Sequence, residues 1–253
     1  MDVATAKPTP EERRRVPHHM IDVADPTERY DAARYQREAR AVLAGLESRG
    51  VLAVVVGGSG LYVRALLDGL DLAAVPRDPE VRSALERDAE RLGGAALHQR
   101  LGALDPAAAA AVDPRNVRRL IRYLEVATMA GSVSAFWTRG APIPATKVGL
   151  RPPRDLLARR IEARVRDMVA RGVLAETSRL LACGVAITLP SMSGHGYPHW
   201  VRHVRGEIDL ETAIALTVRD TKAYSKRQMT WFRRDDAIRW YDPTLEDPLE
   251  ELL

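Results

Sequence analysis

The feature that most constrains the fold is a short apolar run at Val51–Val56, which ends in the small-residue turn Gly-Gly-Ser-Gly at 57–60. A run that is short, apolar and rich in β-branched residues is typical of a buried strand in a parallel sheet. An amphipathic helical pattern over 29–49 precedes the run, and a second helical pattern begins at Leu61. This order predicts a parallel α/β sheet, in which ligands bind at the carboxyl ends of the strands. We therefore expect Ser59 at a site-forming edge.

The middle of the chain has a different pattern. From Asp78 to about Gly131 the apolar spacing is helical throughout. The sequence therefore predicts an all-helical insertion at 78–138 within a core formed by 1–77 and 139–253. For the second part of the core we predict a strand at 147–150, helices at 154–171, 173–183 and 209–226, a glycine-rich bend at 190–198 and a final apolar stretch at 237–242.

Composition narrows the class of protein. Apolar residues make up 46% of the 253 residues and charged residues 28%, which is typical of a globular chain and excludes a disordered tail, a collagen-like fibre and a coiled-coil rod. No apolar run approaches the roughly 18–20 residues of a membrane span, and residues 1–15 lack the apolar core of a secretory signal. The single cysteine, Cys183, excludes a disulfide framework and a multi-cysteine zinc site and favours a reducing cytoplasm.

The net charge of +4 is mild, but the positive charge is concentrated near the C-terminal end. The window 219–234 holds six basic residues and one acid, with Tyr224, Trp231 and Phe232 among them. Basic residues interleaved with aromatic rings suit contacts to RNA phosphates and stacked bases. A solvated helix face that packs through its own aromatic residues has the same composition, so both interpretations stay open at this point.

One single arginine and one set of three arginines stand out on predicted helices. At about 100° per residue, Arg164 falls beside Leu157 at the edge of the apolar stripe of the helix at 154–171. A buried arginine is costly unless it is paired or bound to an anion, so Arg164 indicates either an internal salt bridge or a phosphate contact. The set of three forms one basic helix face, for which a solvated surface and a nucleic-acid contact both stay open: Arg118, Arg119 and Arg122.

Several motifs with defined chemistry are absent or incomplete. The turn at 57–60 is not a G-x-S-x-G nucleophile elbow, because Leu61 stands where the second glycine belongs. None of the four lysines follows a glycine, so residues 1–253 contain no G-x-x-x-x-G-K-[ST] phosphate loop. His195, His199 and His203 have helical spacing, but glycines and a proline interrupt a helix there, and no carboxylate or cysteine completes a zinc set.

Seven segments, taken in order and spacing, carry a family resemblance. They are MDVATAKP, VPHHMIDVADP, VVVGGSGLYVRALLDGL, DPEVR, NVRRLIRYLEV, RIEARV and KRQMTWFRR. Together they resemble the tRNA dimethylallyltransferases, also called tRNA isopentenyltransferases, from Met1 to about Asp242. The most specific of the motifs are VPHH, GGSGLY and KRQ-x-TWFRR.

The resemblance implies transfer of a dimethylallyl group from dimethylallyl diphosphate to the N6 amine of the adenosine 3′ of the tRNA anticodon, with Mg²⁺. It also implies a nucleotide- and ATP-binding, P-loop-type α/β core with a helical insertion that holds the anticodon stem-loop. We expect a cytoplasmic monomer without a membrane partner. By motif, Arg164 would bind the diphosphate. The residues that would contact tRNA are Ser59, Arg82, Arg118, Arg119, Arg122, Ser193, Gly196, Tyr197, Lys226, Arg227, Gln228, Trp231 and Arg233.

The chain departs from the family pattern in two ways. Pro198 stands where many members have a basic residue after Gly-Tyr, which weakens one expected tRNA contact. The family's phosphate-binding loop, first strand and catalytic aspartate lie upstream of the motif at Met1, so we expect residues 1–253 alone to lack an amide cradle for the diphosphate and a base for the amine proton.

Three hypotheses about function follow from these departures. The first is a prenyltransferase whose N-terminal segment is missing from this sequence, through a late start site or because the sequence is a fragment. The second is a non-catalytic tRNA-binding derivative. The third is a relative that prenylates adenine nucleotides, which the helical insertion disfavours.

Overall fold

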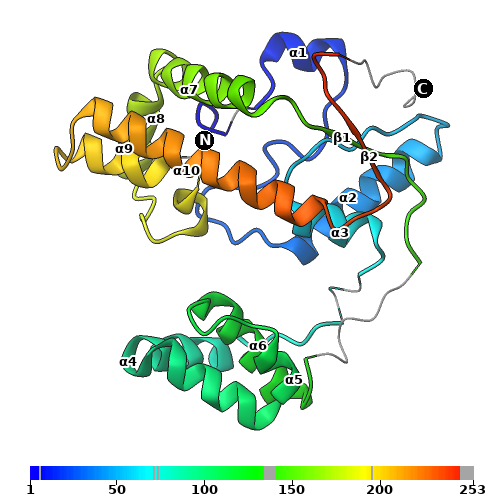
Figure 1. The fold of residues 1–253 in the computed structure, drawn as a ribbon, viewed down its shortest axis with the longest axis vertical. Helices are drawn as coiled ribbons and strands as arrows, with labels where there is room; N and C mark the ends of the chain where they lie inside the picture. The colour runs from blue at the N-terminus through cyan, green and yellow to red at the C-terminus, as the bar shows by residue number, and fades with distance from the viewer. Residues whose placement is uncertain (6, 71, 73, 134–140, 195, 246–253) are drawn as a thin grey trace. The chain divides into compact units, whose positions relative to one another are not determined.

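The structure, a computed structural model, describes residues 1–5, 7–70, 72, 74–133, 141–194 and 196–245. These residues form mainly helices, together with one small parallel sheet (Figure 1). The chain divides into two compact units. The first unit consists of 1–31, 38–60 and 145–253, and the second of 32–37 and 61–144. The predicted insertion at 78–138 falls within the residues of the second unit, although 134–138 lie outside the described residues.

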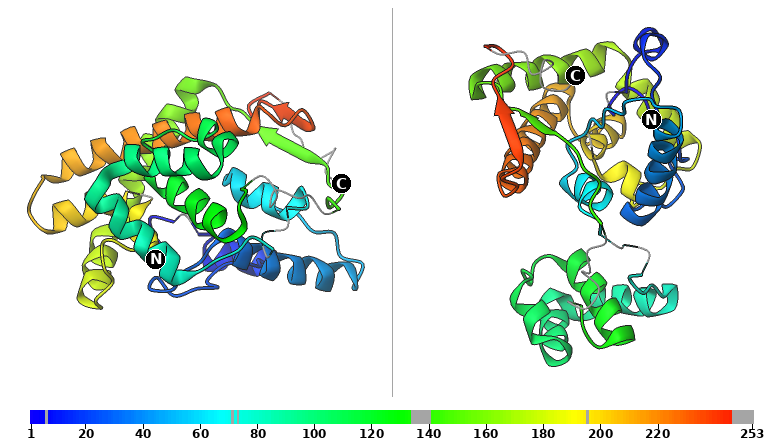
Figure 2. Two further views of the ribbon diagram at one scale, coloured as in Figure 1. Left: turned by 90° about the horizontal axis from the view of Figure 1, so that it is seen from below. Right: turned by 90° about the vertical axis from the view of Figure 1, so that its right-hand side faces the viewer.

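The second unit is built mainly from α4 (Pro79–Leu104), α5 (Pro106–Ala110) and α6 (Val117–Ala130). Both α5 and α6 pack against α4 (Figures 1 and 2), and apolar side chains of the three helices enclose one core, with Leu101, Leu120 and Leu124 fully buried. Side-chain caps fix where these helices begin, as at Asp78, which accepts hydrogen bonds from the first N–H groups of α4. The helical character predicted for this stretch is therefore observed.

The first unit contains α1 (Pro10–Arg15), most of α2 (Ala32–Glu47), and a group of four packed helices (Figures 1 and 2). These four are α7 (Arg154–Ala170), α8 (Val173–Ala182), α9 (Tyr197–Val204) and α10 (Leu210–Phe232). The core between them includes Val165, Tyr197, Trp200 and Ile214. The predicted bend at 190–198 contains a short 3-10 turn, η2 (Pro190–Ser193), and the first residues of α9.

The sheet has two strands, β1 (Lys147–Leu150) and β2 (Ile238–Tyr241). They pair in parallel, with Lys147 opposite Ile238 and Leu150 opposite Tyr241. The strand predicted at 147–150 is therefore confirmed, and the apolar stretch at 237–242 provides its partner. An ion pair of 2.7 Å between Lys147 Nζ and Asp235 Oδ2 lies just before β2.

The prediction of a buried strand at Val51–Val56 is wrong. The structure assigns no strand to these residues, and Leu52, Val54 and Val56 are exposed, Val56 by 90%. A strand requires a neighbouring backbone to complete its hydrogen bonds. Among the described residues β1 and β2 pair with each other, and neither pairs with this run. The glycine turn nevertheless leads into a helix as predicted, since α3 (Gly60–Leu67) begins at its last residue.

The helix predicted at 209–226 is longer than expected. It begins where Asp209 accepts a hydrogen bond from the Thr212 N–H at 2.7 Å, and it continues to Phe232. Most of the basic window at 219–234 therefore lies on the C-terminal half of one continuous helix. None of the helices within the described ranges is long and apolar enough to span a lipid bilayer.

Candidate nucleic-acid interface

The C-terminal half of α10 lies directly against the glycine turn at 57–60. The Gln228 amide donates a hydrogen bond to the carbonyl oxygen of Gly58 at 2.9 Å, and the Tyr224 hydroxyl reaches the same oxygen at 3.4 Å. A Cβ atom at Gly60 would lie 2.1 Å from Trp231 Cδ1, and one at Gly58 would lie 2.1 Å from Gln228 Nε2. At Gly60 a Cβ atom would meet the Trp231 ring itself, so glycine allows the close approach there, and the turn and the helix form one surface.

Cations and rings gather on this surface. Ser59, Lys226 and Arg227 are exposed, and Trp231 is 36% exposed. The Arg227 guanidinium lies 5.7 Å from the centre of the Tyr224 ring, within the range of a cation–π contact. Exposed cations that form no ion pair with any described residue stay available to phosphates, and the surface holds four of them: Lys226, Arg227, Arg233 and Arg234.

The bend at 193–198 provides a second polar edge in the first unit. Ser193 is exposed, and its hydroxyl donates to the carbonyl oxygen of Pro190 at 2.6 Å. Tyr197 was expected to contact tRNA, but its side chain is fully buried and its hydroxyl donates to Glu176. Its ring is therefore closed to a direct RNA contact. His195 lies outside the described residues.

Arg164 is not in the buried position that its place beside the apolar stripe predicts. On α7 the residues Ile161, Val165 and Met168 face the core, whereas Arg164 is exposed. Leu157, next to Arg164 around the helix, is only half-buried, so this edge of the stripe already lies at the surface. Arg164 forms no ion pair with any described residue, which removes the internal salt bridge as its role.

The arginines of the second unit, the helical unit formed by α4, α5 and α6, fall into two kinds. Arg122 Nη1 lies 2.7 Å from Glu125 Oε2, and Arg82 Nη1 lies 3.4 Å from the same oxygen. The side chain of Glu125 is only 3% exposed, so both arginines neutralise a buried carboxylate. Arg118 and Arg119, in contrast, are exposed and form no ion pair with a described residue. On the predicted basic face of α6, Arg122 therefore pairs with a buried acid, whereas Arg118 and Arg119 face solvent.

Sequence reasoning missed two buried acids that organise these regions. Glu125 lies between Leu124 and Val126 on α6, and Glu176 shares one face of α8 with Val173 and Leu180. In both cases an acid at an apolar helical position was a usable signal, because a buried carboxylate needs several donors. Among the described residues, no three or more His, Cys, Asp or Glu side chains gather in a way that would hold a metal ion.

Comparisons with known proteins identify the family. Residues 1–235 match the family model described as IPP transferase. A tRNA dimethylallyltransferase from Syntrophobacter fumaroxidans is 44% identical over 247 residues, covering 96% of this chain and 72% of the relative. A tRNA dimethylallyltransferase from Thermomicrobium roseum is 44% identical over 255 residues, covering 100% of this chain and 77% of the relative.

Solved structures have the same fold. A full-length tRNA isopentenylpyrophosphate transferase from Bacillus halodurans has a TM-score of 0.70 at 37% identity, covering 100% of this chain and 80% of that one. A eukaryotic dimethylallyltransferase at 23% identity has a TM-score of 0.74, over 95% of this chain and 63% of its own. The mixed helical architecture with a small parallel sheet is therefore that of a known class of transferases. The chain belongs to the IPP transferase family.

Proposed function

We propose that this protein takes part in tRNA modification by transferring a dimethylallyl group from dimethylallyl diphosphate to the N6 amine of the adenosine 3′ of the anticodon. In this reaction the N6–C1 bond forms and the C1–O bond to the diphosphate breaks. The diphosphate leaves with the bonding electrons, and the amine loses a proton to a base. The adenosine has to be flipped out of its stack before the amine can react.

The single observation that carries the proposal is the surface formed by α10 and the glycine turn, in a chain that belongs to this family. Its unpaired cations suit the phosphates of a tRNA loop, and its exposed Trp231 and Tyr224 suit an unstacked base. Arg118 and Arg119 supply a further cationic patch on α6 for the anticodon stem. We propose the same role for Ser193 and for the backbone at Gly196.

The leaving group requires positive charge that acts most strongly as its own negative charge develops. We propose Arg164 for this contact, because its guanidinium is exposed and has no carboxylate partner among the described residues. Mg²⁺ is proposed from the family resemblance alone. An ion that binds through a diphosphate needs only one or two protein carboxylates. The described residues offer no larger donor cluster, and we assign no step to the ion.

We propose that the protein is cytoplasmic and that its core is P-loop-like and nucleotide-binding. We also expect residues 1–253 alone to bind tRNA without turnover. They contain no G-x-x-x-x-G-K-[ST] loop that would give the diphosphate an amide cradle and a lysine. Asp2 is a poor substitute base, because its hydrogen bond from Lys7 at 2.7 Å lowers the pKa of the carboxyl. Incorporation of labelled dimethylallyl diphosphate into unmodified tRNA by residues 1–253 measures this directly, and turnover would contradict it.

The proposed tRNA contact is tested by binding to an unmodified anticodon stem-loop RNA over a range of salt concentrations. Replacing both Lys226 and Arg227 by alanine should reduce the salt dependence by roughly 0.7–0.9 powers per lost phosphate contact. The matched control replaces Arg166 and Arg171, whose guanidinium groups already pair with Glu211 and Asp167. Equal slopes in the two double variants would show that the α10 cations form only a solvated surface.

The same measurements separate the proposed enzyme from the alternatives. A non-catalytic tRNA-binding derivative would bind the stem-loop with the same salt dependence, but would stay inactive in any longer form of the chain. An adenine-nucleotide prenyltransferase would bind the stem-loop only weakly and would modify free adenine nucleotides. Arg118 and Arg119, exposed in a helical unit, favour the RNA substrate.

A further inference from the structure

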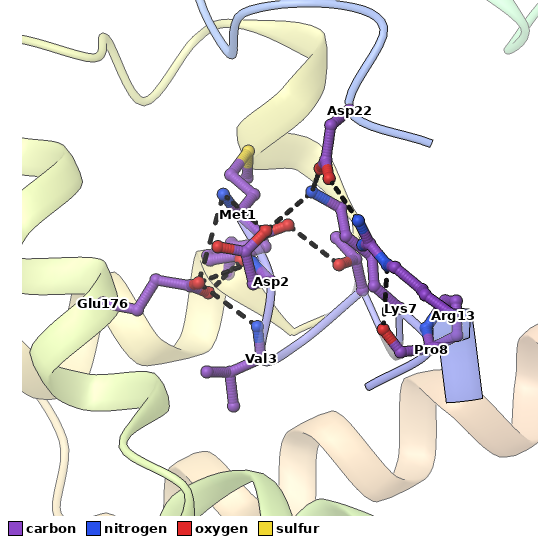
Figure 3. A network of polar contacts seen from close by, with 10 residues as sticks. Met1, Asp2, Val3, Lys7, Pro8, Arg13, Asp22 and Glu176 are labelled. Atoms are coloured by element: carbon purple, nitrogen blue, oxygen red, sulfur yellow. Dashed lines mark hydrogen bonds and ion pairs between the residues drawn. The ribbon is translucent and has the colours of Figure 1, made fainter. Parts of the chain in front are cut away.

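One buried carboxylate of the first unit is not part of the proposed tRNA surface. Glu176 lies on α8, and only 3% of its side chain is exposed. Its Oε1 accepts a hydrogen bond from the Tyr197 hydroxyl at 2.5 Å. Its Oε2 accepts from the backbone N–H groups of Asp2 at 2.5 Å and Val3 at 3.2 Å (Figure 3). One carboxylate therefore joins two segments that are far apart in the sequence.

These donors keep the carboxylate charged. Burial by itself raises the pKa of Glu176, but the Tyr197 hydroxyl and the two N–H groups favour the anion and leave its pKa below the ordinary value. Burial and the adjacent carboxylate in turn raise the pKa of Tyr197, so its hydroxyl remains a donor. A buried carboxylate without such partners is strongly destabilising. The position of Glu176 and the positions of its donors are therefore fixed together.

One end of this arrangement is the bend at 193–198. Gly196 has φ of +83°, and a Cβ atom there would lie 2.6 Å from Thr217 Cγ2 and 2.8 Å from Trp200 Nε1. The backbone at Gly196 is thus pressed against α9 and α10, and the buried Tyr197 is the next residue. Tyr197 is the first residue of α9, so its place fixes where this helix begins.

The other end is the N-terminal segment, residues 1–7. Asp2 accepts from Lys7 Nζ at 2.7 Å, Lys7 also contacts Asp22, and Asp22 Oδ2 lies 2.8 Å from Arg13 Nη1 (Figure 3). These alternating charges connect the segment to 13–22. Ala4, 2% exposed, belongs to the same apolar core as Tyr197. The two N–H bonds to Glu176 therefore hold the first residues of a segment that is also joined by ion pairs to 13–22.

We propose that Glu176 is a positioning residue, which holds Tyr197 and the adjoining backbone at Gly196 where that backbone can meet the tRNA, and which ties the N-terminal segment to the same point. This inference rests on the proposed function. Glu176 touches no RNA itself, because its carboxylate is enclosed. It acts through Tyr197 on one side and through Asp2 and Val3 on the other.

Three variants test this role in the full chain. Glu176→Ala removes all three hydrogen bonds, whereas Glu176→Gln keeps an oxygen for the two N–H groups and an amide that can donate to the Tyr197 oxygen. Tyr197→Phe keeps the ring and removes only the hydroxyl, so it remains informative if Glu176→Ala does not fold. The matched control is Glu211→Ala, which removes an exposed carboxylate whose partner is Arg166.

Two readouts are compared: amide hydrogen exchange by ¹⁵N NMR at Val3, with Ile214 in α10 as internal reference, and affinity for the anticodon stem-loop RNA. We expect Glu176→Ala to speed exchange at Val3, to leave Ile214 unchanged and to weaken RNA binding about tenfold. Glu176→Gln should stay close to the parent, and Tyr197→Phe should weaken RNA binding a few-fold while Val3 remains protected. Glu211→Ala should change neither readout.

The inference is overturned by any of three results: unchanged exchange at Val3, equal acceleration at Val3 and Ile214, or parental RNA affinity in both Glu176→Ala and Tyr197→Phe. Equal acceleration would reveal a purely structural acid. If the parent itself binds no stem-loop, the proposed function fails. Local acceleration at Val3 would then still establish that Glu176 places the segment.

Discussion

Arg122 on α6 and Arg227 on α10 both belong to basic helical segments, but only Arg122 has a carboxylate partner. Its guanidinium and that of Arg82 surround the buried Glu125, and Arg122 also donates to the carbonyl oxygen of Pro76 at 2.8 Å. Arg227 faces solvent beside the Tyr224 ring. The comparison shows that the role of an arginine is set by the anion that the fold provides, and that charge density in the sequence does not distinguish a structural cation from a ligand-binding one.

The largest expected effect comes from removing the charge of Glu125, the buried partner of Arg122. Glu125→Gln leaves Arg122 without a carboxylate partner among the described residues and leaves Arg82 with Glu86 alone, and losing charge-assisted hydrogen bonds to a buried carboxylate costs about 1.5–3 kcal/mol. The free energy of unfolding, measured by chemical denaturation, should fall accordingly. Glu90→Gln, on the exposed face of α4, is the control and should change it little. Similar losses in both variants would mean that the Glu125 cluster contributes no more than a surface charge.

The exposed surface that carries Arg227 depends on the close contact between α10 and the glycine turn. Gly60→Ala places a Cβ atom 2.1 Å from Trp231 Cδ1, so the ring must move. Overpacking of this kind costs about 1–3 kcal/mol, and the displaced ring should weaken stem-loop binding. Gly57→Ala is a matched control, since a Cβ atom there meets nothing within 4 Å. The indole NMR signal of Trp231 should shift in the first variant only, and a shift in neither would contradict the contact.

A smaller effect sharpens the comparison within α6 itself. Replacing Arg118 and Arg119 by alanine should lower the salt dependence of stem-loop binding by roughly 0.7–0.9 powers per lost contact and leave the free energy of unfolding unchanged. Arg122→Ala should do the reverse, because its partner is Glu125. Both quantities are measured on both variants. If Arg122→Ala reduced RNA binding without loss of stability, the division of this face into two roles would be wrong.

Local patterns predicted most of the helices, because caps and apolar spacing act over a few residues. The helical unit, α7, α8 and β1 all appear close to where the sequence predicts them. The apolar run at Val51–Val56 failed as a strand because a strand depends on a neighbour, which spacing within the run does not reveal. The prediction that Arg164 is buried was wrong because the edge of an apolar stripe need not be covered by another element.

The candidate site was predictable only in part, for a related reason. The cations of α10 and the glycine turn could be selected from composition and motif, although their contact through Gln228 could not. The acids that organise the fold act over long separations: Arg82 and Glu125 are 43 positions apart in the sequence, and Asp2 and Glu176 are 174 positions apart. Sequence separation of this size gives no local signal. What remains locally visible is an acid placed on an apolar helix face.

The smallest expected effect concerns an exposed ion network, which contrasts with the buried pair at Glu125. Hydrogen bonds from Lys7 and Arg13 lower the pKa of Asp22 to about 2 from its ordinary 3.8. Because the folded-state pKa is the lower one, the network stabilises the protein fully above pH 3.8, and this contribution is lost as the pH falls toward 2. Asp22 is 49% exposed, so screening limits the effect to roughly 0–1 kcal/mol. The difference in unfolding free energy between the parent and Asp22→Asn should therefore be constant near neutral pH and shrink between pH 4 and 2. Asp236→Asn, at an exposed aspartate, is the control, and a difference that grew as the pH fell would reverse the sign assigned to this network.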